Sequence, residues 1–158
     1  MKWEISCLAN NSCLDAESLT QLIHESIPLS EAMHFNIEVL ADQSITVVAP
    51  LTPNINVHGT GFAGSLYSLA ALSAWALTTH LINQAGLKAD VVMASAEIRY
   101  RRPIQSEIRC QCECMPVVSL TFIKHLKRKG RARLSLMVEL GDNADVVFSA
   151  AMVASHKA

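Results

Sequence analysis

A loop that leads into a long uncharged helix decides the fold of this chain, and it reads Asn54-Ile-Asn-Val-His-Gly-Thr-Gly-Phe-Ala-Gly-Ser65. Ala, Leu and Ser dominate the residues that follow, and their spacing predicts one helix over Phe62–Gln84. Gly86 stands where such a helix would stop, because glycine readily adopts the left-handed conformation that ends many helices. Turn residues fill Pro50–Gly61, so we expect a loop to lead to the helix start.

The segment from Gln43 to Leu87 contains no Asp, Glu, Lys or Arg. The helix within it is long enough to span a bilayer. However, polar side chains such as Ser65, Thr78 and Asn83 occur on every side of it. A helix buried inside a protein therefore fits the pattern better than a membrane span.

Shorter elements precede this helix. Leu19, Leu22, Ile23 and Ile27 recur at helical spacing, which predicts a helix over Asp15–Ile27. Two short strands are expected next, with Asp42-Gln43 as the turn between them. They cover Phe35–Leu40 and Ser44–Ala49.

Strands are expected after the helix. Apolar and polar residues alternate over Val92–Tyr100, with Val92, Ala94, Ala96, Ile98 and Tyr100 on the apolar face, and again over Ile108–Met115. Further strands are predicted over Phe122–Leu126, Leu134–Leu140 and Val146–Val153, with hairpin turns at Lys129-Gly130 and Gly141-Asp142-Asn143. Together these elements predict an α+β fold in which one long helix is wrapped by a single curled antiparallel sheet.

Composition limits the class of protein. The chain has 158 residues, of which 51% are hydrophobic and 17% charged, so it can fill a core and is not expected to be disordered. We expect one domain over residues 1–158. The net charge of −1 and the aromatic content of 5% argue against binding nucleic acid.

The cysteines suggest neither a metal site nor a disulfide framework. Their number, five, is odd, and no two have C-x-x-C spacing. The first residues contain no apolar signal segment, so we expect a reducing, cytoplasmic setting. Cys110, Cys112 and Cys114 share one strand face and are expected in the core. Trp75 and His80, late in the long helix, are expected to serve packing or an interface rather than a site.

Three glycines, Gly59, Gly61 and Gly64, lie where the loop becomes the helix. The unpaired N–H groups of a helix start can stabilise a developing oxyanion. The spacing does not match a phosphate-binding loop, and no lysine follows. A purely structural role in tight turning and packing is the alternative.

The order of elements and the stretch Asn56-Val-His-Gly-Thr-Gly-Phe-Ala-Gly-Ser-Leu-Tyr-Ser-Leu-Ala70 resemble the hotdog-fold thioesterases. More narrowly, the chain resembles the bacterial thioesterase-like domain found alone or fused behind an acetyltransferase domain. Thioesterases of the related phenylacetic-acid-pathway type show N-x-x-G-x-x-H-G-G followed by an Asp on the helix. Asn56, Gly59 and Gly64 match this motif, and Ile98-Arg-Tyr-Arg-Arg-Pro-Ile104 resembles a later family strand. The resemblance covers about residues 35–153.

The chain departs from the family pattern at three positions. Phe62 occupies the position of the motif His, Ala63 that of the first helix glycine, and Ala71 that of the catalytic Asp. The resemblance then leaves Asn56 and the N–H groups near Ala63 to polarise a thioester carbonyl. His58 is a candidate base or a structural loop histidine, and Glu97 is a weaker candidate that a surface pair with Arg99 or Arg101 would explain.

The candidate residues fall into three groups. Catalytic roles are predicted for Asn56, His58, Gly59, Ala63 and Gly64. Substrate contacts are predicted for Thr60, Phe62, Ser65, Leu66, Met93, Ser95 and Tyr100, with Ser68 as a further residue that could orient water. Contacts to coenzyme A are implied by the resemblance for Lys127, Arg128, Lys129, Gly130 and Arg131.

The last group lies in a basic stretch, Lys124–Arg133, which holds six of the 13 basic residues and no acid. We expect it at the tip of a hairpin. It suits the phosphates of coenzyme A, or an acidic acyl carrier protein with its phosphopantetheine arm. A solvated hairpin tip is the alternative.

The resemblance implies hydrolysis of an acyl-CoA or acyl-carrier-protein thioester by a homodimer or dimer of dimers. No cofactor or metal is expected, with coenzyme A entering only as part of the substrate. Two alternatives stay open. One is a module that binds acyl thioesters without hydrolysing them and acts with an acetyltransferase. The other, ranked third, is a hydratase or dehydratase, which needs a carboxylate that residues 43–87 lack.

Overall fold

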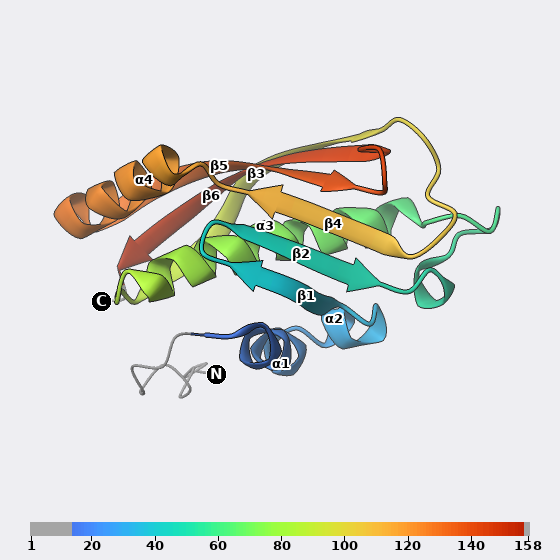
Figure 1. Ribbon diagram of the computed structural model, residues 1–158, viewed down its shortest axis with the longest axis horizontal. Coiled ribbons are helices and arrows are strands. Elements are labelled where there is room, and N and C mark those ends of the chain that lie inside the picture. Colours follow the sequence, from blue (N-terminus) through green and yellow to red (C-terminus); the bar gives the residue numbers. More distant parts are fainter. Residues whose placement is uncertain (1–13, 157–158) are drawn as a thin grey trace.

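The computed structural model describes residues 14–156 and contains one six-stranded sheet and four α-helices within that range (Figure 1). In chain order the elements are α1 (Ala16–Ser26), α2 (Pro28–Ala32), β1 (Asn36–Ala41), β2 (Ser44–Ala49), a 3-10 turn (Thr52–Asn54), α3 (Ala63–Gln84), β3 (Ala89–Tyr100), β4 (Ile108–Glu113), α4 (Pro116–Lys129), β5 (Arg131–Leu140) and β6 (Val146–His156). The α+β prediction is confirmed, and so are the predicted helices at 15–27 and 62–84.

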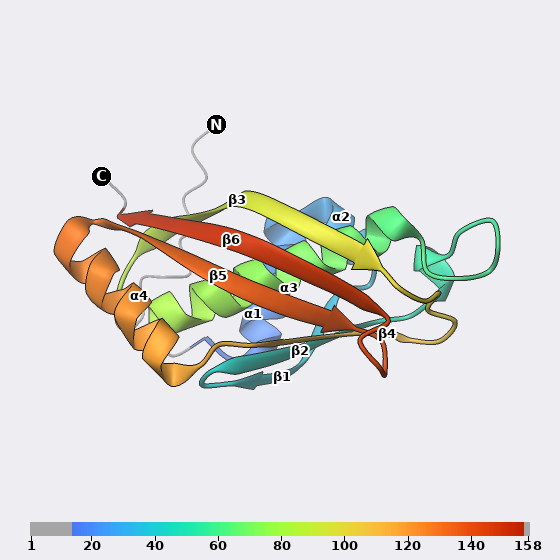
Figure 2. The ribbon, with the colours of Figure 1, turned by 90° about the horizontal axis from the view of Figure 1, so that it is seen from above.

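The sheet curls around α3. Its strand order is β1-β2-β4-β5-β6-β3, and all neighbours are antiparallel. The helix contacts β2, β3, β4, β5 and β6, so it lies inside the curl (Figure 2). Because α3 has no charged residue, every turn of it can face the sheet or the other helices without burying a charge. None of the described helices is apolar and long enough to cross a membrane.

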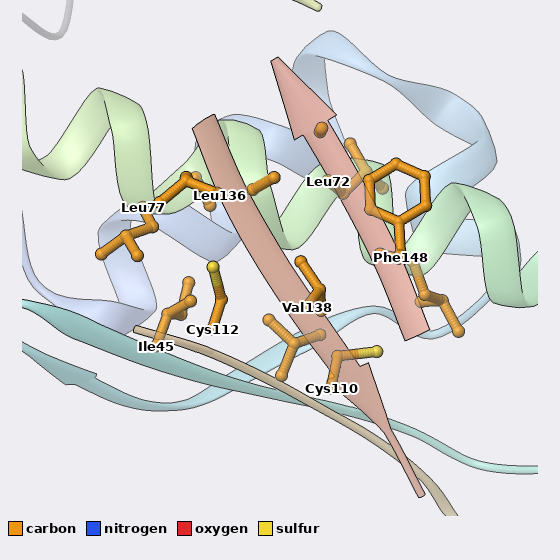
Figure 3. Packing of buried hydrophobic residues seen from close by; sticks show 14 of the residues in the cluster. Ile45, Leu72, Leu77, Cys110, Cys112, Leu136, Val138 and Phe148 are labelled. Atoms are coloured by element: carbon orange, nitrogen blue, oxygen red, sulfur yellow. The ribbon is translucent and has the colours of Figure 1, made fainter. Parts of the chain in front are cut away.

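The core between sheet and helix is made of branched aliphatic, aromatic and cysteine side chains. Cys110 and Cys112 of β4 lie among Ile45 of β2, Leu77 of α3 and Val138 of β5 (Figure 3). The core placement predicted for Cys110, Cys112 and Cys114 is confirmed, since each is at most 3% exposed. Cys7 and Cys13 lie outside the described residues.

A β-bulge divides β3 into two parts. Met93 pairs with Met152 and Ser95 with Ala151, so Ala94 is an extra residue. A single extra residue reverses which side chains face inward. Val91 and Met93 therefore face the same side as Ala96 and Ile98, whereas the simple alternation put Met93 on the polar face and Val92 on the apolar one. That part of the prediction was wrong.

Residues 116–129 form a helix, α4, where the sequence analysis predicted a strand and a hairpin. Pro116 occupies its first turn, and Ser119, Phe122 and Leu126 are buried at helical spacing. Gly130 has φ 69°, and its N–H donates to the Leu126 carbonyl, which ends the helix. The strand over Phe122–Leu126 and the hairpin turn at Lys129-Gly130 were wrong, because five residues with apolar side chains at 122, 123 and 126 are compatible with either element.

Candidate functional site

The side chain of Asn56 holds the loop before α3 together. Its Oδ1 accepts from the backbone N–H groups of His58 (2.8 Å) and Thr60 (3.1 Å). Its Nδ2 donates to Thr60 Oγ1 (2.9 Å) and to the Gly61 carbonyl (3.4 Å). An asparagine amide has two donors and two acceptor lone pairs, so these four contacts use its whole capacity. Asn56 therefore shapes the loop and has no free group to offer a substrate in this conformation.

Two further contacts fix this loop. The Gly59 N–H donates to the Asn56 carbonyl at 3.1 Å, and Gly59 has φ 75°, a conformation that favours glycine. The Gly61 N–H donates to the Ile104 carbonyl at 2.8 Å, which ties the loop to the segment after β3. The loop is thus hydrogen-bonded to the segment between β3 and β4 on the side where α3 begins.

The first turn of α3 presents unpaired N–H groups. Phe62 is the N-cap residue, and within residues 14–156 no side chain caps this helix and no acid lies in its first turn. The first helical hydrogen bond joins the Leu66 N–H to the Phe62 carbonyl at 2.9 Å. The N–H groups of the preceding residues, Ala63, Gly64 and Ser65, point out of the helix at the positive end of its dipole. They can donate to an oxygen that gains negative charge.

Gly64 lies against the neighbouring aromatic ring. A Cβ at position 64 would lie 2.5 Å from Phe62 Cε1, so any other residue would displace that ring. The Phe62 side chain is 52% exposed and covers the helix start. The ring forms an apolar wall beside the N–H groups, and a substrate contact of Phe62 stays a prediction.

The end of β3 is joined to the helix start through Tyr100. Its hydroxyl donates to the Ala63 carbonyl at 2.9 Å. Partial burial, with a smaller effect of the nearby Tyr67, raises the pKa of Tyr100, so the hydroxyl stays protonated. Tyr67 packs edge-on against Phe148, with ring centroids 5.2 Å apart. Tyr100 and Phe62 thus lie at the start of α3, and Tyr67 packs one turn further along.

The remaining predicted substrate residues are divided between the two faces of the sheet. Leu66 is buried, and its side chain would contact a Cβ added at Gly61, while Met93 lies on the inner face and is 37% exposed. Ser95 faces outward and accepts from Arg133 Nη2 at 3.4 Å. The structure therefore brings Leu66 and the loop together but places Ser95 on the other side of the sheet.

The candidate bases differ in their surroundings. Glu97 forms an exposed ion pair with Arg99 at 2.9 Å, as the surface-pair interpretation predicted. His58 is exposed in the loop, where only its backbone N–H is engaged by Asn56. Ala71, which stands for the family's Asp, is half-buried and packs against the core. His58 is thus the one titratable side chain of the described loop 50–62.

The basic stretch lies at the other end of the molecule. Arg131 of β5 pairs with Ser155 of β6, and the Gly130 carbonyl accepts from the His156 N–H. His156 in turn pairs with Ala89, the first residue of β3. The loop adjoins the last residue of β3, Tyr100. These ends are about 30 Å apart, judged from the rise per residue along α3 and β3. One copy of the chain therefore does not bring the coenzyme A residues to the loop (Figure 2).

Sequence reasoning missed two anchoring residues. Asn54 is buried, and its Nδ2 donates to the carbonyls of Met33 and Pro50 at 2.9 Å each. Trp75 Nε1 donates to the Val91 carbonyl at 3.1 Å and ties α3 to β3. An asparagine that follows a proline in a turn was a usable signal for Asn54, whereas Trp75 was expected only to pack.

The core cysteines are expected to resist alkylation in the native protein. Burial raises the pKa of Cys110 and Cys112 to about 12, and raises that of Cys114 as well, so the reactive thiolate is scarce near pH 8. Mass spectrometry of tryptic peptides after brief iodoacetamide treatment should find these three unmodified, and modified after unfolding in guanidinium. Rapid native labelling of Cys110 would contradict the described packing.

No cluster of three or more His, Cys, Asp or Glu in residues 14–156 is arranged to hold a metal ion. The helix start offers backbone N–H groups beside the Phe62 ring, and the exposed His58 lies in the loop that precedes it. This set suits a reaction in which a carbonyl oxygen gains negative charge.

The chain is similar to known proteins over most of its length. A family model described as "Putative thioesterase (yiiD_Cterm)" matches residues 16–154. A structure described as a putative thioesterase, from Shewanella oneidensis, has a TM-score of 0.81 at 31% identity and covers 90% of this chain and 97% of its own. A Chlorobaculum tepidum protein of unknown function has a TM-score of 0.86 at 26% identity over 90% of this chain and 94% of its own. The arrangement of helix and sheet is the hotdog fold.

Proposed function

The chain belongs to the "putative thioesterase (yiiD_Cterm)" family, and from that premise we propose that it hydrolyses an acyl-CoA or acyl-carrier-protein thioester. The observation that supports this most directly is the uncapped first turn of α3, which the Asn56 loop and Tyr100 hold in place. Its N–H groups are positioned to stabilise the oxyanion of acyl transfer. The acyl chain would lie against Phe62, Leu66 and Met93.

In this mechanism the thioester oxygen accepts hydrogen bonds from the N–H groups of Gly64 and its neighbours. Water attacks the carbonyl carbon while His58 takes a proton from it. The tetrahedral intermediate then collapses, the C–S bond breaks, and the leaving thiolate takes that proton. The products are a carboxylate and a free thiol, with the second proton released to solvent. Asn56 acts as a positioning residue, because its polar atoms are all engaged by the loop.

We further propose that the working unit is a homodimer formed through the free edge of β3, with a dimer of dimers as a further assembly. Within residues 14–156 the one strand paired with β3 is β6, so no strand of the described chain covers its other edge. Apolar residues along this edge and on the adjoining face of α3 are only half-buried. They are Tyr67, Ala71, Trp75, Val91, Ala96 and Ile98. A second copy would cover them.

The dimer also accounts for the distance between the two predicted parts of the site. Two β3 strands paired antiparallel about a two-fold axis place the start of one beside the end of the other. The basic end of one copy would then lie beside the start of α3 in the second copy. The residues at that basic end are Lys127, Arg128, Lys129, Gly130 and Arg131. Phosphates of coenzyme A or of phosphopantetheine would bind there in a cytoplasmic setting.

A turnover panel tests the proposed function. Acyl-CoA and acyl-carrier-protein thioesters from acetyl to long chain are incubated with the native protein, and products are separated by chromatography. Hydrolysis of at least one series is expected. Thioester binding without hydrolysis would contradict an enzyme and leave a binding module, for which an acetyltransferase would be the partner to seek. Such a lack of hydrolysis would be explained by Ala71, which occupies the position of the family's catalytic Asp.

A further inference from the structure

A histidine is enclosed near the C-terminal end of α3. His80 is 4% exposed, and neither of its ring nitrogens has a hydrogen-bond partner within the described residues. A buried imidazole usually donates from one nitrogen and accepts at the other, because a buried polar group without a partner costs free energy. Among the described side chains of α3, His80 alone leaves two buried polar atoms without a partner.

The turn between β1 and β2 lies against this histidine. The ring is beside the Ala41 carbonyl and the Asp42 carboxylate. One turn further along α3, Gln84 Nε2 donates to Asp42 Oδ1 at 3.3 Å on the surface. Gln43, the second residue of the turn, has a buried Oε1 that lacks a hydrogen-bond partner in residues 14–156. The end of α3 and the turn therefore meet through polar groups that are mostly unbonded.

The charged group that acts on the His80 ring is Asp42. α3 itself contains no Asp, Glu, Lys or Arg. β4 contributes Cys112 and Cys114 to the core that it shares with α3, and both thiols are neutral because burial raises their pKa. The other titratable residues on the surrounding elements α1, β3 and α4 are exposed to solvent, among them Asp15, Lys88, Asp90, Lys124 and His125.

An imidazole is not needed here to fill space. A leucine or phenylalanine in this place would leave no polar atom without a partner. What the imidazole adds is a proton equilibrium, since no other side chain of α3 titrates between about pH 5 and 8. The position of His80, between the end of the helix and an acidic turn, lets that equilibrium act on the contact between them.

The direction of the effect follows from the surroundings. Burial lowers the pKa of His80, and the Ala41 carbonyl and the Asp42 carboxylate oppose this effect without outweighing it. A histidine that reaches water has a pKa of about 6.5. Opening of the contact therefore takes up a proton once the pH falls below that value. The contact is most stable above about pH 6.5 and weakens as the pH decreases through that value.

We propose that His80 is a proton-operated latch between the end of α3 and the β1–β2 turn. The neutral imidazole stays enclosed and keeps the last turns of the helix against the turn. In acid the imidazole takes one proton from solvent, moves into water beside Asp42, and frees residues 79–87 from the turn. No covalent bond changes, and the inference does not depend on the proposed function.

The opening is local because the rest of α3 is held independently. Trp75 Nε1 bonds the Val91 carbonyl, and Tyr100 bonds the Ala63 carbonyl at the far end of the helix. Beyond His80 the ties are weaker, since the Gln84 contact is exposed and Asn83 Oδ1 accepts from the Leu14 N–H at 3.2 Å. Terminal segments with few buried contacts open at a lower free energy than the whole molecule.

Hydrogen–deuterium exchange of the full chain at about pH 7.5 and about pH 5.5 tests the latch, with labelling times adjusted for the slower chemical exchange in acid. Residues 79–87 and 41–44 of the native protein should open about tenfold more often at the lower pH, because an exposed histidine is about ten-to-one protonated there. Residues 66–75 should not change. His80→Gln should open equally often at both pH values. His125→Gln is the matched control, since His125 is an exposed helical histidine, and it should respond like the native protein.

Several results would overturn the latch. These are equal opening of residues 79–87 at both pH values in the native protein, a pH response that His80→Gln retains, and acceleration spread over the whole chain. If His80→Gln does not fold, NMR titration of the native histidines decides. His80 should stay neutral below about pH 6.5 while His125 becomes protonated. A His80 that titrates together with His125 would contradict the proposal.

Discussion

Asn56→Ala lowers kcat/KM for thioester hydrolysis about 100-fold, because the loop that orders the start of α3 loses its internal support. The substitution removes four hydrogen bonds at once, to His58, Thr60 and Gly61. The fall should appear mainly in kcat, since the N–H groups that stabilise the transition state lose their alignment. Steady-state kinetics on the best substrate of the thioester panel measures it.

Thr60→Val is the matched control for this prediction. It removes only the Thr60 hydroxyl that accepts from Asn56, and leaves the two backbone donors to Oδ1 in place. Its loss of activity should be several-fold at most. Thermal unfolding should place both variants within a few degrees of the native protein, because the loop is exposed and adds little to the core. An Asn56→Ala protein with native kcat would contradict a role for this loop.

Mixing two inactive variants is expected to restore activity. The first is Asn56→Ala, and the second reverses the charge of Lys127 and Arg128 to Glu. If each site takes its loop from one copy and its basic end from the other, a mixed dimer contains one intact site. Random exchange of equal amounts makes half of the dimers mixed, so about one quarter of native activity should return.

A chain that carries Asn56→Ala together with Lys127→Glu and Arg128→Glu provides the control. Mixed with Asn56→Ala, it offers no intact loop to any dimer, and no activity should return. Native mass spectrometry verifies that subunits have exchanged. Mixed dimers without recovered activity would show that each site lies within one copy, and a monomer at assay concentration would contradict the dimer altogether.

The sequence predicted the helix over 62–84 because its uncharged, small-residue composition admits few other interpretations. It also predicted β2 and β4, where apolar and polar residues alternate and Asp42-Gln43 marks the turn before β2. It misassigned residues 122–126, since Phe122 and Leu126 are compatible with a strand when considered alone. Pro116 and Gly130, placed at the two ends of α4, were the signals that favoured a helix.

The predicted site was assembled from two regions that lie far apart in one copy. The loop residues and Tyr100 do meet at the start of α3, because β3 runs antiparallel to the helix and ends there. The basic stretch lies at the opposite end, which a motif comparison does not reveal because it contains no distances. The saturated hydrogen bonding of Asn56 was equally hidden, since an asparagine looks the same in sequence whether its amide is free or engaged.

The extra residue in β3 changes which side chains face the helix along the strand. Before Ala94 the odd-numbered residues face the helix, and after it the even-numbered ones do. Deleting that one alanine would make the alternation of inward and outward side chains continuous along the strand. One half of the strand would then be reversed, so that either Val91 and Met93 or Ala96 and Ile98 face outward. Substitutions along this strand are thus far less disruptive than a change of its length. Relatives aligned across it are comparable position by position only when they keep the same number of residues.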